Sequence, residues 1–436
     1  MKWRQPAERE VVEAVVATFR APADDVHRLL SPLSQRQWVR SYHWLDASGM
    51  ALYFLTRIER LGLQGSIPAA VLARLRQNLA DNCNRSTAMF AEFAELNRVF
   101  RAAGIDYCNL KGFTLSPDSC PSPALRCQLD FDFLVDGRHL EICRAVLAQR
   151  GYILRARTTK VWEFKTDSDQ LADIADYYKA KPQRCAEVHF SCEAEAPHMP
   201  ARDSRLDRLS WRSRGGLDFP ALSPVDLFIG QATHLFAHLC GACTRLAWLL
   251  EFTHHIGVRF DDRQFWNAVQ ERAAADRTAA IAVGVACLLA ANLFAAEIPP
   301  GLEEYAARLP EGVALWVERY GRRALLADFP GTKLNLLLRA QLGGDDAAWK
   351  KEKRTALVPL HRAPRILPVR SGAGLLKRLR GELYQLRFDL FRLRFHFVEG
   401  LRYALEAARW RRQIALHQAG LQLEPSPRIH STTEPS

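Results

Sequence analysis

The stretch "LRCQLDFDFLVD", residues 125–136, places Asp130 and Asp132 in an otherwise apolar run. Side chains alternate between the two faces of a β-strand. Asp130, Asp132 and Leu134 are therefore expected on one face, and Phe131, Phe133 and Val135 on the other. Burying like charges together is costly unless a cation or hydrogen bonds compensate them. Either this face therefore meets solvent, or a positive group lies against it.

The same run belongs to a segment in which the apolar pattern changes from helical to strand-like. A helical pattern extends from about Val11 to Ala103 and is followed by Gly104, a typical helix stop. Beyond it, "IDYCNL", "LDFDFLV", "YILRAR", "KVWEFK" and "CAEVHF" are predicted strands, and "RHLEICRAVLAQRG" is a predicted helix. Strands interleaved with one clear helix indicate a compact α/β unit.

The whole chain is therefore expected to be an α+β protein, with a small mixed-sheet core flanked by N-terminal and C-terminal helical regions. Helical patterning returns after Pro224, and the later stretch "HRAPRILPVRSGAG" is typical of a linker. The predicted parts are an N-terminal helical region (1–103), an α/β core (104–200), a helical domain (220–345), a linker (361–373), a basic amphipathic helix (374–418) and a disordered tail (419–436).

The formal net charge of +12 is concentrated near the C-terminus. Residues 361–412 contain thirteen Lys/Arg and four Asp/Glu, a surplus of nine, which leaves three for the rest of the chain. The basic balance therefore says little about the α/β core. Because the ten cysteines suggest no disulfide framework and the N-terminus has no apolar signal-peptide core, we expect a cytoplasmic location.

The predicted C-terminal helix carries apolar residues that repeat every seven positions, as in a coiled coil. Three uses of this helix remain open: packing on the protein's own helical domain, self-association, and contact with an anionic membrane surface as a peripheral protein. Nucleic-acid binding is a weaker alternative because no recognisable motif supports it. The heptad series are Leu376, Leu383, Leu390 and Phe397, and Leu379, Leu386 and Leu393, with Arg380, Arg387 and Arg394 beside them.

One apolar segment imitates a membrane span. Residues 278–296, "TAAIAVGVACLLAANLFAA", lack any charged side chain, and their length is near the roughly 20 residues that cross a bilayer. The segment is rich in alanine, which is only weakly hydrophobic. We therefore expect a buried helix of a helical domain and not a membrane helix.

Two further motifs of the α/β unit suggest chemistry when they are combined with the aspartate pair. In "NLKGF", a predicted strand ends at Lys111 and Gly112; a glycine allows backbone N–H groups to approach a phosphate, and a lysine supplies a charge. In "AEVHF", Glu187 shares a strand face with His189. Three carboxylates on adjacent strands would form an oxygen-rich site suited to Mg²⁺ or Mn²⁺. This combination indicates metal-assisted phosphoryl or nucleotidyl transfer.

The ordered set "GIDYCNLKG", "LRCQLDFDFLVD" and "AEVHFSC" resembles the uncharacterised nucleotidyltransferase family of the DNA polymerase β-like superfamily. The similarity covers most of residues 75–300, including the helix before the α/β unit and the helical region after it. The resemblance implies a nucleotidyltransferase fold for the predicted core. It also implies a site in which metal ions and an NTP such as ATP bind together.

Carried over to this chain, the resemblance assigns Asp130, Asp132 and Glu187 as catalytic carboxylates that ligate Mg²⁺ or Mn²⁺. Lys111 and Gly112 would contact the triphosphate of the nucleotide. Two more residues are assigned less central roles: Arg126 would assist in nucleotide binding, and His189 is expected to be structural or to support a metal ligand.

The implied activity is transfer of a nucleoside monophosphate from an NTP to an unidentified acceptor, with release of pyrophosphate. The acceptor would be a small molecule, a glycan precursor or a protein. The chain departs from the superfamily pattern at Phe113, where a small residue is usual, and at Glu187, where an aspartate is usual. Phe113 favours the alternative of a catalytically inactive module that binds nucleotide or supports a pathway complex. An RNA-modifying transferase that holds RNA with its basic tail is a weaker alternative.

The stretch "HLFAHLCGAC" contains His234 and His238 one helical turn apart, followed by Cys240 and Cys243. Imidazole and thiolate are zinc ligands. The cysteines follow the second histidine too closely for an ordinary zinc-finger arrangement, so a structural role for the histidines is the favoured interpretation.

Overall fold

The computed structural model describes the chain in two compact units, which are treated separately. The predicted linker (361–373) and the predicted disordered tail (419–436) lie outside the described residues. The first unit comprises Met1–Pro310 and Val317–Gly331, and the second comprises Glu311–Trp316 and Thr332–Ser436. The described residues are 7–166, 177–180, 183–193, 199–343, 346–358 and 375–418.

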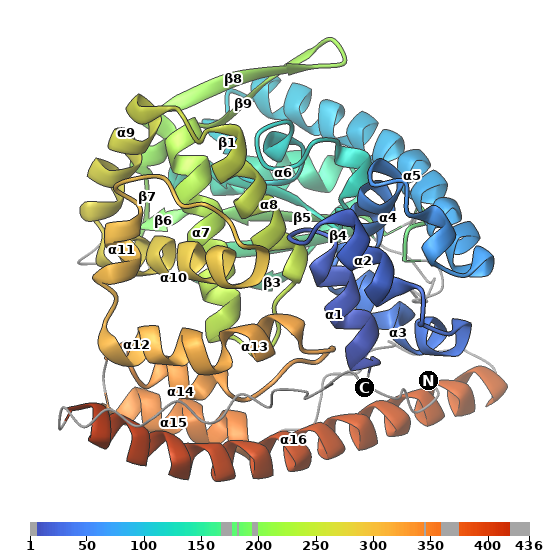
Figure 1. The fold of residues 1–436 in the computed structure, drawn as a ribbon. Helices are drawn as coiled ribbons and strands as arrows, with labels where there is room; N and C mark the ends of the chain where they lie inside the picture. The colour runs from blue at the N-terminus through green and yellow to red at the C-terminus, as the bar shows by residue number, and fades with distance from the viewer. Residues whose placement is uncertain are drawn as a thin grey trace, which may run out of the picture. The chain divides into compact units, whose positions relative to one another are not determined.

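The first unit begins with five helices, as the sequence pattern predicted (Figure 1). The Ser34 side chain accepts a hydrogen bond from the Gln37 backbone N–H, and the Gln37 side chain accepts one from the Ser34 backbone N–H, a capping box that starts the third helix. The fifth helix is followed by Gly104, whose φ of +65° explains why glycine ends it. The helices are α1 (Arg9–Ala17), α2 (Ala23–Leu30), α3 (Gln35–Ala47), α4 (Met50–Arg60) and α5 (Ala69–Ala102).

A seven-stranded mixed sheet with the order β3-β4-β5-β2-β1-β9-β8 forms the centre of this unit. The β2–β5 and β1–β9 pairs are parallel, and the remaining neighbours are antiparallel. The predicted α+β class and all five predicted strands are confirmed, together with the predicted helix α6 (Leu140–Gln149). The strands are β1 (Tyr107–Asn109), β2 (Phe131–Val135), β3 (Tyr152–Arg157), β4 (Val161–Thr166), β5 (Cys185–His189), β8 (Leu209–Arg214) and β9 (Leu217–Leu222), and a separate pair consists of β6 (Ser191–Cys192) and β7 (Pro200–Ala201).

The β8–β9 hairpin is part of the sheet although the sequence pattern did not predict it. Its turn consists of Gly215 and Gly216, whose φ angles of +54° and +75° suit a tight hairpin turn. Strand β9 then pairs with β1 through Asn109 and Ala221. Pro220 lies within β9, and a proline argues against a strand because it cannot donate a ladder hydrogen bond. This local signal concealed the strand.

One face of the sheet packs against α5 and α6. The ring centroid of Phe133 on β2 lies 4.8 Å from that of Phe100 on α5, and Leu147 of α6 is fully buried in the same core. Phe131 and Val135 also belong to this core. Burial of each such side chain contributes roughly 1.5–3 kcal/mol. The alternation predicted for β2 is therefore confirmed, and Asp132 is left on the opposite face of the sheet.

Helices follow the sheet in the first unit, again as predicted. The Ser223 side chain accepts a hydrogen bond from the Asp226 backbone N–H and starts the first of them, with Pro224 at a position where its missing N–H costs nothing. The helices are α7 (Pro224–Cys240), α8 (Leu246–Val258), α9 (Arg263–Ala274), α10 (Arg277–Phe294), α11 (Glu303–Ala307) and α13 (Arg322–Leu326).

Helix α10 coincides with the apolar segment that imitates a membrane span. By length and composition it is the one helix in the described part of the chain that could cross a membrane, but 61% of its apolar window is buried inside the protein. It packs against α7, α8 and α11. A buried helix, the interpretation favoured from the sequence, agrees with this packing.

The second unit is helical in its described residues. The indole Nε1–H of Trp316 donates a 2.9 Å hydrogen bond to the carbonyl of Leu334 and ties the short first helix to the segment before α14. The last helix occupies the place of the predicted basic amphipathic helix. The helices are α12 (Glu311–Trp316), α14 (Asn335–Arg339), α15 (Asp346–Leu357) and α16 (Leu375–Gln418).

A fully buried histidine, His255 of α8, makes the stability of the first unit depend on pH. Its Nδ1 lies 2.9 Å from Gln231 Nε2 and 3.1 Å from Ser119 Oγ, and its ring stacks on Phe265. The Nε2 atom has no hydrogen-bond partner. Burial is the main cause that lowers the pKa of His255 to about 4. The neutral ring is therefore the form that the fold accommodates.

Acidification from pH 7 to pH 5 is expected to reduce the free energy of unfolding by about 2 kcal/mol through His255. The sign follows from proton uptake: between the ordinary pKa and the lowered one, the unfolded chain binds more protons than the folded chain. Urea unfolding at both pH values measures the loss, and His255→Gln should remove it. His27→Gln, at an exposed histidine, is the matched control. An unchanged pH dependence in His255→Gln would contradict this prediction.

Candidate functional site

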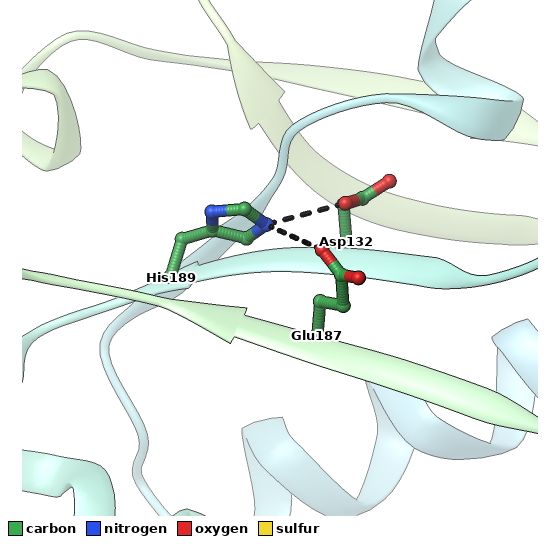
Figure 2. Close-up of side chains that lie close together, drawn as sticks. All are labelled: Asp132, Glu187 and His189. Carbon is green, nitrogen blue, oxygen red and sulfur yellow. Dashed lines mark hydrogen bonds and ion pairs between the residues drawn. The ribbon is translucent and has the colours of Figure 1, made fainter. Parts of the chain in front are cut away.

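Asp132 and Glu187 lie side by side because the parallel register of β2 and β5 pairs them directly. His189 is two residues beyond Glu187 and therefore points to the same face. Figure 2 shows the His189 ring beside the two carboxylates with one nitrogen directed at both, and this Nε2 lies 3.2 Å from Asp132 Oδ1 and 3.4 Å from Glu187 Oε2. One ligand atom from each of the three residues lies within 4.8 Å of the others. Within the described ranges, this is the one such group of potential metal ligands.

Lys111 is the positive group that lies against the acidic face of β2. Its Nζ is 3.1 Å from Asp132 Oδ1, the same oxygen that accepts from His189. Burial alone would raise the pKa of Asp132, but the Lys111 cation and the His189 hydrogen bond outweigh it and lower the pKa below its ordinary value. Burial likewise opposes the charged form of His189, yet the two carboxylates raise its pKa. Asp132 is thus held as a carboxylate.

Asp130 has a different environment from Asp132 although only one residue separates them. It precedes β2, and the Gln128 side chain donates a 2.8 Å hydrogen bond to its backbone carbonyl. Burial, followed by the charge of the Asp132 carboxylate, raises the pKa of Asp130 to about 6. The charges of Lys111 and Glu187 also act on its carboxylate, but Asp130 does not belong to the group formed by Asp132, Glu187 and His189. A role for Asp130 as a metal ligand stays a prediction.

The turn after Lys111 requires glycine. Gly112 has a φ of +70°, and a Cβ atom there would lie 2.4 Å from Gln128 Nε2. The next residue, Phe113, is buried in the core on the α5 side of the sheet. Its ring centroid is 5.2 Å from Phe90 and 5.0 Å from Phe93, both on α5. The side chain of Phe113 therefore packs in the hydrophobic core and does not itself cover the turn at Gly112.

Arg126 forms an ion pair that the sequence pattern did not suggest. Its Nε lies 3.2 Å from Oε1 of Glu251, a residue of α8 that is 3% exposed. The Tyr53 hydroxyl donates a 2.9 Å hydrogen bond to the same oxygen. Burial alone would lower the pKa of Arg126, but the Glu251 carboxylate outweighs it and raises the pKa above its ordinary value. A nucleotide contact by Arg126 stays a prediction, while its partner in the structure is Glu251.

The two histidines of α7 form an aromatic cluster with Trp248 of α8. The ring centroids of His234 and His238 are 4.6 Å apart, and they lie 4.6 and 4.4 Å from that of Trp248. His238 Nδ1 is 3.3 Å from the carbonyl oxygen of Cys243, so this cysteine contributes its backbone to the contact. Burial first, and the Lys111 cation second, lower the pKa of His234 to about 2. His234 is therefore a neutral ring near the acidic site.

The sequence contained a signal that His234 and His238 lie together, because side chains four positions apart lie on one face of a helix.

Glu163 is a further acidic residue near the site that the sequence pattern did not indicate. Glu163 of β4 pairs in register with Glu187 and so belongs to the same face of the sheet, and its Oε1 lies 2.6 Å from Lys165 Nζ. The acidic row therefore extends over β2, β5 and β4.

The donor set fits a hard divalent cation. Two carboxylates and an imidazole can together hold Mn²⁺, and carboxylates with water are the usual ligands of Mg²⁺. The convergence of three ligand atoms within 4.8 Å is the structural observation that supports this fit. A mixed sheet that carries such a site beside a lysine–glycine turn defines an α+β domain of the nucleotidyltransferase class.

The family comparison agrees with this class. The model of a family described as "Uncharacterised nucleotidyltransferase" matches residues 34–295, which is more than half of the chain, and the chain belongs to this family. The family resemblance inferred from the LKG, DFD and EVH motifs is thereby confirmed. No curated protein and no solved structure matches the chain.

Proposed function

We propose that the protein is a metal-dependent nucleotidyltransferase that moves a nucleoside monophosphate from an NTP to an acceptor hydroxyl and releases pyrophosphate. The observation that carries this proposal is the convergence of Asp132, Glu187 and His189 next to the Lys111–Gly112 turn. Family membership supports a transferase in general. The acidic group supports the finer assignment of metal-assisted chemistry.

In this proposal each residue has a role that follows from its position. Asp132 and Glu187 would hold Mg²⁺ or Mn²⁺ with His189, and Asp130 would add a fourth ligand. The bound ion would neutralise charge that develops on the transferred phosphoryl group. Gly112 allows the backbone to approach the triphosphate, and Lys111 exchanges its bond with Asp132 for a phosphate oxygen. In the reaction, a bond forms between the acceptor oxygen and the α-phosphorus, the bond to pyrophosphate breaks, and the hydroxyl proton is released.

The alternative of an inactive nucleotide-binding module depended on Phe113. Because this side chain packs between Phe90 and Phe93 in the core, it gives no reason for a loss of phosphate binding. We therefore favour the enzyme. The acceptor is proposed to be a small molecule, a glycan precursor or a protein that meets the enzyme in the cytoplasm.

The proposal is tested by measuring pyrophosphate release from each of the four common NTPs with Mg²⁺ or Mn²⁺ and candidate acceptors. We expect release that requires the metal, stops on addition of EDTA and returns when Mn²⁺ is added in excess. Intact-mass measurement of protein and acceptor identifies where the nucleoside monophosphate is attached. Calorimetric NTP binding without product across all acceptors would contradict the enzyme and support the binding module.

A further inference from the structure

Helix α16 exposes a complete heptad seam. Figure 1 shows α16 as one continuous helix. All seven apolar residues of the two heptad series are between 45% and 84% exposed. Apolar residues at two positions in every seven are the pattern of a coiled-coil helix, and Leu375, Val398, Leu401 and Leu405 are exposed on α16 outside the seam. The seam residues are Leu376, Leu379, Leu383, Leu386, Leu390, Leu393 and Phe397.

Other positions of α16 are already covered within the second unit. Glu399 is buried, and the backbone N–H of Lys333 donates to Glu399 Oε2 at 3.4 Å. The ammonium group of Lys333 also donates to the carbonyl of His396, and Lys353 Nζ lies 5.6 Å from the centroid of the buried Tyr403 ring. The helix is therefore formed and held by its own unit through positions outside the seam. Binding of a partner to the seam therefore does not have to supply the free energy for helix formation.

We propose that α16 pairs with α16 of a second copy of this chain as a parallel, in-register coiled coil. The charges beside the seam specify this partner and this direction. One flank carries Arg380, Arg387 and Arg394, each one residue after a seam leucine, and the other flank carries Glu382 and Asp389, each one residue before one. In a parallel pair, each acidic residue faces the residue five positions later on the opposite helix.

Both acidic positions then meet an arginine. Glu382 faces the partner's Arg387, and Asp389 faces the partner's Arg394. An antiparallel pair would place the arginine flank against the arginine flank and the acidic flank against the acidic flank, so like charges would repel. The sequence of charges therefore selects one orientation.

The basic surplus of this region would attract an anionic membrane, but the two acidic residues beside the seam favour a second α16 as the partner of the seam itself. A helix that lies on a membrane has a broad apolar face with cationic residues beside it. On α16, Glu382 and Asp389 lie directly at the edge of the seam. Anionic headgroups would repel these carboxylates, whereas a second α16 pairs them.

Sedimentation equilibrium of the full chain tests the pairing. We expect twice the mass of one chain for the wild type and the mass of one chain for Leu383→Glu combined with Leu390→Glu. Leu405→Glu is the matched control, because Leu405 is 59% exposed and lies off the seam, whereas Leu383 is 55% exposed. A single-chain mass for the wild type, or an unchanged mass for the seam variant with native circular dichroism, would overturn the proposal.

Two further measurements test the direction. Glu382→Arg with Asp389→Arg should be monomeric, Arg387→Glu with Arg394→Glu should be monomeric, and a mixture of the two variants should form a pair. Leu383→Cys should form a disulfide between copies on oxidation, because a parallel, in-register pair brings residue 383 of both chains together. A dimer without this cross-link, measured against the wild type with its native cysteines, would overturn the orientation. Binding of the wild-type monomer to phosphatidylserine vesicles without dimerisation would overturn the choice of partner.

Discussion

Replacement of Asp132 by asparagine is expected to lower the rate of nucleotidyl transfer by roughly a thousandfold or more, beyond the 10–100-fold typical of residues that only support a metal ligand. One oxygen of Asp132 accepts from both Lys111 and His189, and Glu187 lies beside it in register. Asparagine keeps the size of the side chain and removes its charge. The lowered pKa of Asp132 means that this charge is present at every pH at which the enzyme would work.

A matched control is available at the other end of β2. Asp136 is fully buried and pairs with Arg138 at 2.5 Å and Arg202 at 3.0 Å. Asp136→Asn also removes a buried charge from this region, so it should cost about 1–3 kcal/mol of stability but leave turnover of the remaining folded protein unchanged. Pyrophosphate release and Mn²⁺ binding by calorimetry are compared for both variants. Activity that persists in Asp132→Asn would exclude this site as the catalytic centre.

The position of Asp132 on the strand face away from the core could be predicted from the sequence. Alternation along "LDFDFLV" predicted that Asp132 would face away from Phe131 and Phe133, because the period of a strand is fixed. A buried carboxylate requires compensation, so the sequence left two alternatives, a face that meets solvent or a positive group against it, and Lys111 is that positive group. These inferences depend on one strand and on general electrostatics, and they were therefore accessible without a structure.

The pairing of strands was not accessible in the same way. β5 lies beside β2 and β9 beside β1, although long stretches of chain separate the members of each pair. The parallel register that sets Glu187 next to Asp132 depends on these distant contacts, and local patterns do not encode it. For the same reason, His189 was expected to have a supporting role, whereas the structure places its Nε2 among the three clustered ligand atoms.

The ion pair of Arg126 with Glu251 also joins residues that are distant in the sequence, so local patterns did not predict it. Its loss is expected to have a large effect on stability. Arg126→Met is expected to reduce the free energy of unfolding of the first unit by about 3–5 kcal/mol, because it leaves the carboxylate of Glu251 buried without its cation. Glu251 is 3% exposed, and the Tyr53 hydroxyl, which donates to it at 2.9 Å, cannot neutralise its charge. Urea unfolding followed by tryptophan fluorescence measures this loss.

A double-mutant cycle separates the ion pair from a direct role in nucleotide binding. Glu251→Leu in the Arg126→Met background removes the unpaired charge, so most of the lost stability should return. If the role of Arg126 is to neutralise the Glu251 carboxylate, the double variant also keeps the KM for NTP of the wild type. If Arg126 instead binds phosphate, the KM rises by a similar factor in the single and the double variant, because restored stability does not replace the guanidinium. The two roles therefore predict opposite results for one measurement on a folded protein.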